Sequence, residues 1–219
     1  MTLKSIQQSV SVIGAGAWGS ALALLLARNG ISVRLWGRDK ELIATMSQYA
    51  ENSKYLPNFR FPANLLVCQD LIECLDQNQD VLLVVPSAAF RSILRQLKLI
   101  ANHSLRIAWG TKGLDPETLQ LLHVVVAEEF STDTSMAIIS GPSFATEVAA
   151  GKPTAVSVAG NQQSFVQEWI RKLSNERFRA YYNDDMLGVE LCGTLKNIMA
   201  IAVGIADGLE LGANARSAL

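Results

Sequence analysis

Three glycines near the start of the chain constrain the fold more than any other feature. Gly14, Gly16 and Gly19 stand in the stretch VSVIGAGAWGSALALLLARNG, after a run of β-branched residues and at the start of a helix-forming segment. In a strand–turn–helix unit this G-x-G-x-x-G spacing is typical of a dinucleotide-binding site. The first glycine permits a tight turn, the second lets the backbone approach a pyrophosphate, and the third lets the helix pack close to the strand. We therefore predict that this turn, with Ala17 at the mouth of the helix, binds a dinucleotide.

The end of the next predicted strand indicates which dinucleotide binds. An NAD-specific site usually places an acidic residue about 20 residues beyond the glycines, where it meets the ribose 2′-hydroxyl. Gly37 occupies that position here and Arg38 follows it. A guanidinium suits a 2′-phosphate, and no carboxylate repels one. NADP(H) is therefore the favoured cofactor, and NAD(H) stays open because one register slip would make Asp39 the ribose ligand. Trp18 either lies over the cofactor or packs into the domain.

The order of the predicted elements favours an α/β fold. Short runs rich in β-branched residues alternate with longer segments of helical period, which is typical of parallel βαβ units. The predicted strands are 10–14, 31–36, 65–68, 80–85, 105–109, 136–140, 154–159 and 177–182. The predicted helices are 17–29, 39–50, 87–100, 115–129 and 161–174, and the proline-containing segment 51–64 is predicted to be a loop. This order predicts a Rossmann-like, doubly wound, mostly parallel sheet.

The alternation stops near 183–185, where the sequence NDD offers an N-cap for a closing helix. We therefore expect two parts. Residues 1–184 would form an NAD(P)-binding Rossmann-like domain, and 185–219 would begin an all-α substrate domain. The final stretch GANARSAL reads as the start of another helix. Nothing after it would cover the apolar run at 186–206, so exposed apolar faces and self-association are expected.

Charge and cysteine content exclude several classes of function. A net charge of −1 gives no support to a nucleic acid or an anionic membrane as partner. The three cysteines, Cys68, Cys74 and Cys192, fit neither a metal site nor a disulfide framework. Reduced thiols, and the absence of a secretory signal before the first strand, predict a cytoplasmic protein without a bound metal.

One lysine stands in the middle of the apolar run at 186–206. At helical spacing the face that carries Lys196 is apolar, and so is the face through Leu191 and Leu195. A helix of this kind is normally buried, and burying an unpaired ammonium group is costly. We interpret Lys196 as a functional group, against the alternative that it reaches out to the helix edge. Because charged and polar residues interrupt the run, we predict that it falls short of a membrane span.

Further polar residues follow the predicted strands, where open parallel sheets bind their ligands. Lys112 lies in the stretch GTKG after the strand at 105–109, between glycines that allow close approach. Gly141 and Ser143 follow the strand at 136–140 in the stretch SGPSF. We predict that these segments form the substrate end of the site.

Taken together, these stretches resemble the bacterial-type NAD(P)-dependent glycerol-3-phosphate dehydrogenase family. The similarity runs along the whole chain, through GAGAWGSALA, NSKYLP, VPS, TKGL, SGPSFATEVAAGKPTA and GVELCGTLKNIMAIAVGIADGLELGANARSAL. It implies reversible hydride transfer at C2 of glycerol 3-phosphate. In cells this reaction would be the NAD(P)H-dependent reduction of dihydroxyacetone phosphate for glycerophospholipid synthesis.

The resemblance also implies roles for individual residues. Lys196 matches the family's proton-transfer lysine, and Lys112 matches the lysine shared by substrate and cofactor. Hydride that reaches a ketone leaves an alkoxide, so a desolvated lysine suits proton donation. The small Gly193 and Ala200 are expected to leave space for a three-carbon substrate. The remaining matches are Gly141, Ser143 and Asn197 for the substrate, and Trp18, Arg38 and Ala145 for the cofactor.

Two other hypotheses remain open. The family's helical domain is longer than the tail of this chain, and it supplies an aspartate and an arginine–asparagine pair downstream. Without these groups the substrate phosphate would lose its bidentate partner. The second hypothesis is therefore a catalytically silent NADP(H)-binding fragment. The third is another Rossmann reductase, acting on a sugar nucleotide or a 2-keto acid. A small-molecule substrate is the expected partner, and a homodimer stays open.

Overall fold

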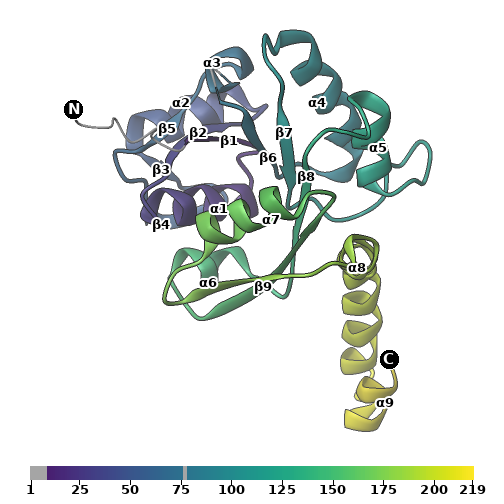
Figure 1. The fold of residues 1–219 in the computed structure, drawn as a ribbon. Helices are drawn as coiled ribbons and strands as arrows, with labels where there is room; N and C mark the ends of the chain where they lie inside the picture. Colours follow the sequence, from purple (N-terminus) through teal and green to yellow (C-terminus); the bar gives the residue numbers. More distant parts are fainter. Residues whose placement is uncertain (1–8, 76–77) are drawn as a thin grey trace.

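The computed structural model describes residues 9–75 and 78–219. Its centre is an eight-stranded sheet with the strand order β10-β9-β8-β7-β6-β1-β2-β5 (Figure 1). These strands are β1 (Ser9–Ile13), β2 (Ser32–Trp36), β5 (Leu65–Val67), β6 (Asp80–Leu83), β7 (Arg106–Trp109), β8 (Met136–Ser140), β9 (Thr154–Gly160) and β10 (Phe178–Tyr182). Every neighbouring pair is parallel except β8 and β9. The predicted Rossmann-like, mostly parallel sheet is confirmed.

Helices cover both faces of this sheet. One face packs against α1 (Ala17–Arg28), α2 (Lys40–Tyr49), α6 (Ala145–Ala149) and α7 (Gln163–Leu173). The other packs against α3 (Leu71–Leu75), α4 (Ser87–Ile100) and α5 (Leu122–Glu129). Adjacent strand residues therefore serve different cores: Val12 faces the first layer and Ile13 the second, both with no exposed surface. This two-sided burial explains why the strands read as continuous apolar runs.

The segment 51–64 differs from its prediction as a loop. It contains β3 (Glu51–Asn52) and β4 (Leu56–Arg60), which pair antiparallel in a separate two-stranded sheet. Asn52 is fully buried there, and its amide donates to the carbonyl of Ala15 at 2.9 Å and to the hydroxyl of Ser20 at 2.8 Å. These contacts hold the segment in an ordered conformation. The sequence does not predict its strands, because the prolines suggest a loop and a single buried amide produces no periodic pattern.

The predicted helix at 115–129 begins later than expected. Its first residues form a turn around Asp115, whose N–H donates to the carbonyl of Gln120 at 2.9 Å. Asp115 also accepts from the hydroxyl of Thr118, and Leu119 takes a left-handed conformation with φ of 57°. Aspartate and threonine side chains compete with helical hydrogen bonds in this way. Regular helix therefore starts only at Leu122.

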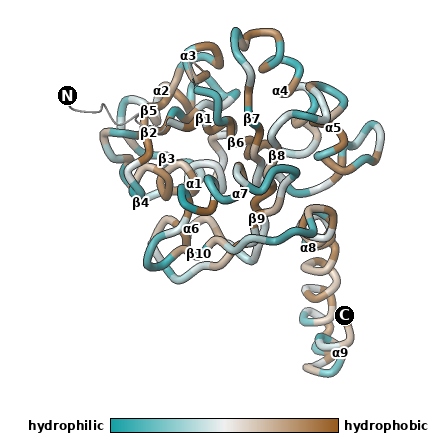
Figure 2. Tube along the Cα trace, viewed as in Figure 1, coloured by the Kyte–Doolittle hydropathy of each residue, from teal (hydrophilic) through white to brown (hydrophobic). Residues whose placement is uncertain are grey.

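The closing helices α8 (Met186–Gly208) and α9 (Gly212–Ala218) extend away from the sheet (Figure 1). Asp185 caps α8 by accepting from the N–H of Gly188 at 2.8 Å, as the NDD sequence predicts. Beyond the first turns, however, apolar side chains of α8 lie in solvent, and Figure 2 shows its hydrophobic residues standing clear of the domain. Leu195 is 50% exposed and Ile198 is 61% exposed. The exposed apolar faces expected for 186–206 are confirmed. The burial that is normal for a helix with two apolar faces is not found along the whole of α8.

Length and composition also make α8 a candidate membrane span, the one such helix among the described residues. Despite Glu190 and Lys196, its length and mean hydropathy are those of a membrane-spanning helix. Core helices of soluble proteins share these properties. Its first turns hold the buried side chains of Val189 and Glu190. These turns therefore belong to the packing of the α/β domain.

Candidate functional site

The glycine turn, residues 14–19, joins β1 to α1 under tight steric limits. Gly14 has φ of +124°, and a Cβ there would lie 2.2 Å from the carbonyl oxygen of Val84. A Cβ on Gly19 would lie 1.8 Å from the carbonyl oxygen of Gly14. A Cβ on Gly16 would meet no protein atom within 4 Å. Two glycines therefore serve the fold itself, while Gly16 leaves exposed backbone free for a ligand to approach.

A pocket of about 370 Å³ opens beside this turn. Its walls come from the ends of β1, β2 and β6, so it lies at the carboxyl edge of the parallel strands. Such an edge is where open α/β sheets bind dinucleotides. Its lining residues include Gly14, Gly16, Gly37, Arg38, Val85 and Pro86. Gly14 and Gly19 shape the cradle, and Gly16 lies open within it, so these residues fit a bound dinucleotide.

Close packing at the end of β2 excludes an acidic side chain at residue 37. A Cβ on Gly37 would lie 2.6 Å from the Cβ of Ala15, so no side chain fits at the position usual for a ribose-binding carboxylate. Arg38 is exposed on the pocket wall. Asp39 caps α2 by accepting from the N–H of Leu42 at 3.1 Å, and this hydrogen bond holds the pKa of Asp39 below its ordinary value. Its carboxylate is therefore already engaged.

Other predicted cofactor residues lie around the start of α1. Trp18 is half-buried and packs against the apolar core, and a Cβ on Gly110 would lie 2.9 Å from its Nε1. Ala17 is half-buried in the first turn of α1. Ala145 begins α6 and packs partly buried against the same core.

The substrate end is built around two lysines, Lys112 and Lys196, called here the lysine pair. Lys112 lies in the loop after β7, and its Nζ donates to the carbonyl of Gly141 at 3.1 Å. Lys196 is half-buried on α8, with its Nζ 5.5 Å from the ring centre of Phe144. Burial, and then the charge of neighbouring Lys196, lower the pKa of Lys112 to about 8. Two ammonium groups thus meet at the end of β8.

The lysine pair is linked to the pocket through the residue before Lys112. The hydroxyl of Thr111 donates to the carbonyl of Val85 at 2.9 Å and accepts from the N–H of Val85 at 3.2 Å. Val85 itself lines the pocket beside the glycine turn. The loop that carries Lys112 is therefore fastened to the cofactor side of the site.

Gly193 brings α8 into contact with the sheet, which corrects the expectation that it leaves space for a substrate. A Cβ at Gly193 would lie 2.8 Å from the hydroxyl of Ser140 and 3.8 Å from Cγ of Lys112. The hydroxyl of Ser140 therefore occupies the space that a side chain at residue 193 would need, and α8 packs closely against β8 at that point. Ala200, two turns further along α8, is exposed.

The predicted substrate residues after β8 lie beside the lysine pair. The hydroxyl of Ser143 donates to the carbonyl of Gly141 at 3.3 Å, the same oxygen that Lys112 contacts. A second pocket, of about 300 Å³, lies next to Gly141 between β8, β9 and α8. The side chain of Asn197 lies outside the described part of the structure. Within the described residues, no group of three or more His, Cys, Asp or Glu side chains could hold a metal.

Sequence reasoning missed several residues that hold this site in place. Ser140 is buried at the contact between β8 and α8, and Asn52 fastens β3 to the glycine turn. Asp115 and Glu190 are buried acids on the two segments that carry the lysine pair. The sequence indicates their role only by position, because each acid stands a few residues from one of the two lysines.

Comparison with known proteins agrees with this geometry. Family models match at 9–166, described as NAD-dependent glycerol-3-phosphate dehydrogenase N-terminus, and at 185–219, described as its C-terminus. Glycerol-3-phosphate dehydrogenase [NAD(P)+] of Coxiella burnetii is 50% identical over 217 residues, covering 99% of this chain. The enzyme of that name from Colwellia psychrerythraea is 47% identical over 216 residues, covering 98% of this chain. The chain spans 65% of the length of each of these two curated relatives.

Solved structures give the same result. A crystal structure of glycerol-3-phosphate dehydrogenase from Coxiella burnetii matches with a TM-score of 0.92 at 51% identity, covering 97% of this chain and 65% of that one. A structure of glycerol-3-phosphate dehydrogenase from Plasmodium falciparum matches with a TM-score of 0.86 at 26% identity, covering 97% of this chain and 62% of that one.

Proposed function

The chain belongs to the NAD-dependent glycerol-3-phosphate dehydrogenase family, and from this premise we propose that it catalyses reversible hydride transfer at C2 of glycerol 3-phosphate. In the cell the reaction would run as reduction of dihydroxyacetone phosphate for glycerophospholipid synthesis. The observation that carries this proposal is the convergence of Lys112 and Lys196 at the end of β8, beside the glycine-turn pocket.

The lysine pair supplies the proton chemistry that such a reaction needs. A dinucleotide, when bound, supplies or accepts the hydride. Reduction leaves negative charge on the former carbonyl oxygen, which a nearby ammonium group stabilises and protonates. We assign proton transfer to Lys196, and contact with both substrate and cofactor to Lys112. Burial, and then the nearby Lys196 ammonium, lower the pKa of Lys112 to about 8, so Lys112 gives up a proton more readily than an ordinary lysine, which supports a role for the lysine pair in proton chemistry.

For the cofactor we propose that NADP(H) is favoured and that NAD(H) also binds. The closed packing at Gly37 leaves Arg38 as the cationic group at the ribose end, and Asp39, which also lines the pocket, accepts the cap hydrogen bond of α2. Gly14, Gly16, Ala17 and Gly19 would hold the pyrophosphate at the start of α1. Trp18 and Ala145 would line the cofactor from the side of α1 and α6.

The remaining assignments concern the substrate and the division of the chain. Gly141, Ser143 and Asn197 would contact the substrate together with the lysine pair. We divide the chain into a cofactor-binding part at 1–184 and a helical substrate part that begins in 185–219. Support for the division comes from α8, which begins at Met186, extends away from the sheet beyond its first turns, and carries Lys196.

A second candidate function, NADP(H) binding without turnover, is favoured by the exposure of α8. Leu195 and Met199 flank Lys196 and are 50% and 40% exposed, so water reaches the helix around the lysine. Exclusion of water strengthens the electrostatic interactions on which such chemistry depends. An open site of this kind would bind a cofactor through the glycine turn and turn over little substrate.

An absorbance assay separates these candidates. NADPH is mixed with dihydroxyacetone phosphate and the purified chain, and loss of NADPH absorbance is followed. Turnover that disappears in Lys196→Ala supports the dehydrogenase. A change in cofactor fluorescence without turnover supports silent binding. Turnover with a 2-keto acid or a sugar nucleotide instead would identify a different Rossmann reductase.

We propose further that two copies of the chain associate through the apolar face of α8. Ile198, Ile201 and Ile205 are each more than half exposed on this helix, and such a surface is costly to leave in water. Light scattering at increasing protein concentration tests the proposal, and a monomer at every concentration contradicts it. The cytoplasm is the proposed location, since all three cysteines are free thiols; cell fractionation checks it.

A further inference from the structure

One short helix, α5, contacts both of the segments that carry the lysine pair. Its first turn lies against α8, which carries Lys196, through a contact between His123 and Glu190. Its last turn is joined through Arg91 of α4 to Asp115, in the loop that carries Lys112. Neither lysine-bearing segment is held by strand pairing at these points.

The contact with α8 is made by a buried carboxylate. Glu190 is 2% exposed, and its Oε1 accepts from the backbone N–H of His123 at 3.2 Å. Its Oε2 lies 2.5 Å from Nδ1 of the His123 ring. A buried carboxylate is costly unless donors satisfy it. Both of its donors come from one residue at the start of α5, so α8 is seated at that point, less than two turns before Lys196.

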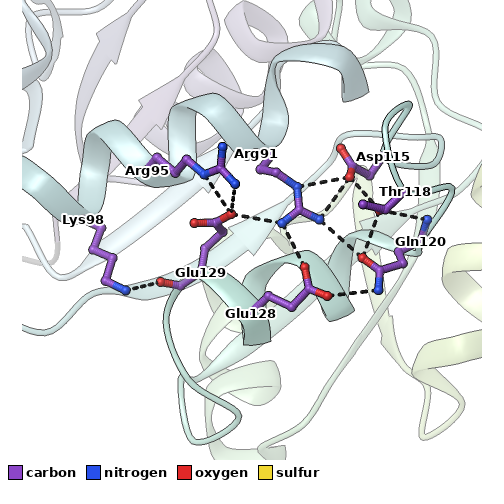
Figure 3. Close-up of polar contacts among 8 residues, drawn as sticks. All are labelled: Arg91, Arg95, Lys98, Asp115, Thr118, Gln120, Glu128 and Glu129. Atoms are coloured by element: carbon purple, nitrogen blue, oxygen red, sulfur yellow. Dashed lines mark hydrogen bonds and ion pairs between the residues drawn. The ribbon is translucent and has the colours of Figure 1, made fainter.

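The contact with the Lys112 loop runs through a buried guanidinium (Figure 3). Arg91 donates through Nε and Nη2 to Asp115 at 3.1 and 3.0 Å. Its Nη1 donates to Glu128 at 2.8 Å and to Glu129 at 3.0 Å, both at the end of α5. Burial alone would raise the pKa of Asp115, but hydrogen bonds from Thr118 and Arg91 hold it below its ordinary value. Asp115 stands three residues after Lys112, so this network fixes an otherwise irregular loop.

From these contacts we infer that α5 sets the distance between the two lysines, with Arg91 and Glu190 as the positioning residues that join it to the two lysine-bearing segments. The inference rests on the proposed function, because the lysine distance matters chemically only if the lysine pair acts on a substrate. The positioning itself is physical and has its own readout. Neither residue needs to touch substrate or cofactor for this role.

The readout is the titration of Lys112. Its pKa is lowered to about 8 by burial and then by the neighbouring charge of Lys196. Both causes weaken if the segments separate, so the pKa of Lys112 would rise towards the ordinary lysine value of about 10.4. Loss of a nearby negative charge acts in the opposite direction, since it lowers the pKa of a lysine. The direction of the change therefore separates positioning from simple electrostatics.

The test uses Glu190→Gln and Arg91→Lys in the full chain. Lysine acylation is measured over neutral to alkaline pH, and the peptide that carries Lys112 is quantified by mass spectrometry. Arg95→Lys is the matched control for Arg91, because Arg95 lies one turn along α4, is 60% exposed, and pairs with Glu129 rather than with Asp115. Glu176→Gln is the control for Glu190, because Glu176 is exposed. Circular dichroism establishes that each variant is folded.

We expect the pKa of Lys112 to rise by about one unit or more in both test variants and to stay near 8 in both controls. An unchanged or lowered pKa in folded test variants would overturn the inference. If either variant does not fold, His123→Ala replaces it; that side chain is 31% exposed, and the same rise is required. Turnover is scored separately: a wild-type chain that never oxidises NADPH contradicts the proposed function and leaves the positioning result intact.

Discussion

The glycine turn and the lysine pair lie at the same edge of the sheet, but they are held there by different forces. At the glycine turn, backbone atoms leave no room for side chains: a Cβ on Gly19 would lie 1.8 Å from the carbonyl oxygen of Gly14. At the lysine pair, one lysine lies on an irregular loop and the other on a largely exposed helix, and buried polar contacts seat both. Steric fixation is rigid and local. The polar contacts join residues that are distant in sequence, and they act beside the close packing of Gly193 against Ser140.

The largest expected effect is on turnover, from the lysine side of this comparison. Lys196→Ala removes the proposed proton donor, so NADPH oxidation with dihydroxyacetone phosphate should fall by about 10²–10⁴-fold. Cofactor binding, measured by fluorescence, should change little, because the glycine-turn pocket does not include Lys196. Lys152→Ala is the control, since the side chain of Lys152 is 61% exposed and distant in sequence from both lysines. Full turnover in Lys196→Ala would remove the lysine from the chemistry.

The next effect is on stability, from the glycine side. Gly19→Ala places a methyl group against the carbonyl of Gly14, and we expect a loss of about 3 kcal/mol or more in the free energy of unfolding. Alanine is otherwise the better helix former by about 1 kcal/mol, so an unchanged or raised stability in urea denaturation would contradict the steric reading.

Gly16→Ala is the matched variant for that experiment. Its Cβ would meet no protein atom, so stability should change by less than about 1 kcal/mol, while NADPH affinity falls because the methyl group intrudes on the ligand's approach. Equal losses of stability in the two variants would show that residue 19 is under no tighter steric limit than residue 16.

The sequence could predict the first region far better than the second, for physical reasons. Glycines at fixed spacing report a local steric requirement, and apolar runs at 10–14 and 80–85 report strands buried on both faces. The structure places strands close to those positions, and it places the predicted N-cap before α8 at Asp185. Each of these features is encoded within a few residues of where it acts.

The second region depends on contacts between distant residues, which no short pattern encodes. His123 and Glu190 are 67 residues apart, and Arg91 and Asp115 are 24 apart. The same limit explains the error over Gly193, whose vacant side-chain position is filled by Ser140 from another element. Periodicity likewise suggested a helix from 115, although the hydrogen bonds of Asp115 and Thr118 keep that segment irregular.

A smaller effect concerns cofactor preference. Arg38→Ala removes the guanidinium that lines the β2 end of the pocket, and we expect NADPH to bind about 10-fold more weakly while NADH binding is unchanged. Isothermal titration with both cofactors measures the two affinities. A parallel loss for both would mean that Arg38 contributes to the pocket without contacting a 2′-phosphate.

A still smaller effect concerns stability against pH. The pKa of Lys112 is about 8 in the folded chain and about 10.4 when unfolded, so between these values the unfolded chain holds more protons. This group therefore makes the free energy of unfolding rise with pH across that window, and the gain is lost as pH falls to about 8. Lys112→Met should remove that rise and stabilise the fold at neutral pH by roughly 1 kcal/mol after solvent screening. Parallel stability curves for the two proteins would contradict this.

The smallest effect is expected on the exposed side of α8. Leu195→Ser alters a side chain that is 50% exposed, so the free energy of unfolding should stay within about 0.5 kcal/mol of the unmodified chain. Self-association, followed by light scattering, should nevertheless weaken. A large loss of stability would mean that this face is packed within the folded chain.

Titration of Lys112 in the unmodified chain and in Lys196→Gln bears most directly on the site as a whole. If the two ammonium groups meet at the end of β8, Lys112 titrates near pH 8, and its pKa rises once the neighbouring charge is removed. If Lys112 titrates near the ordinary lysine value of about 10.4 in both proteins, the lysines do not meet, and the proposed chemistry has no structural basis.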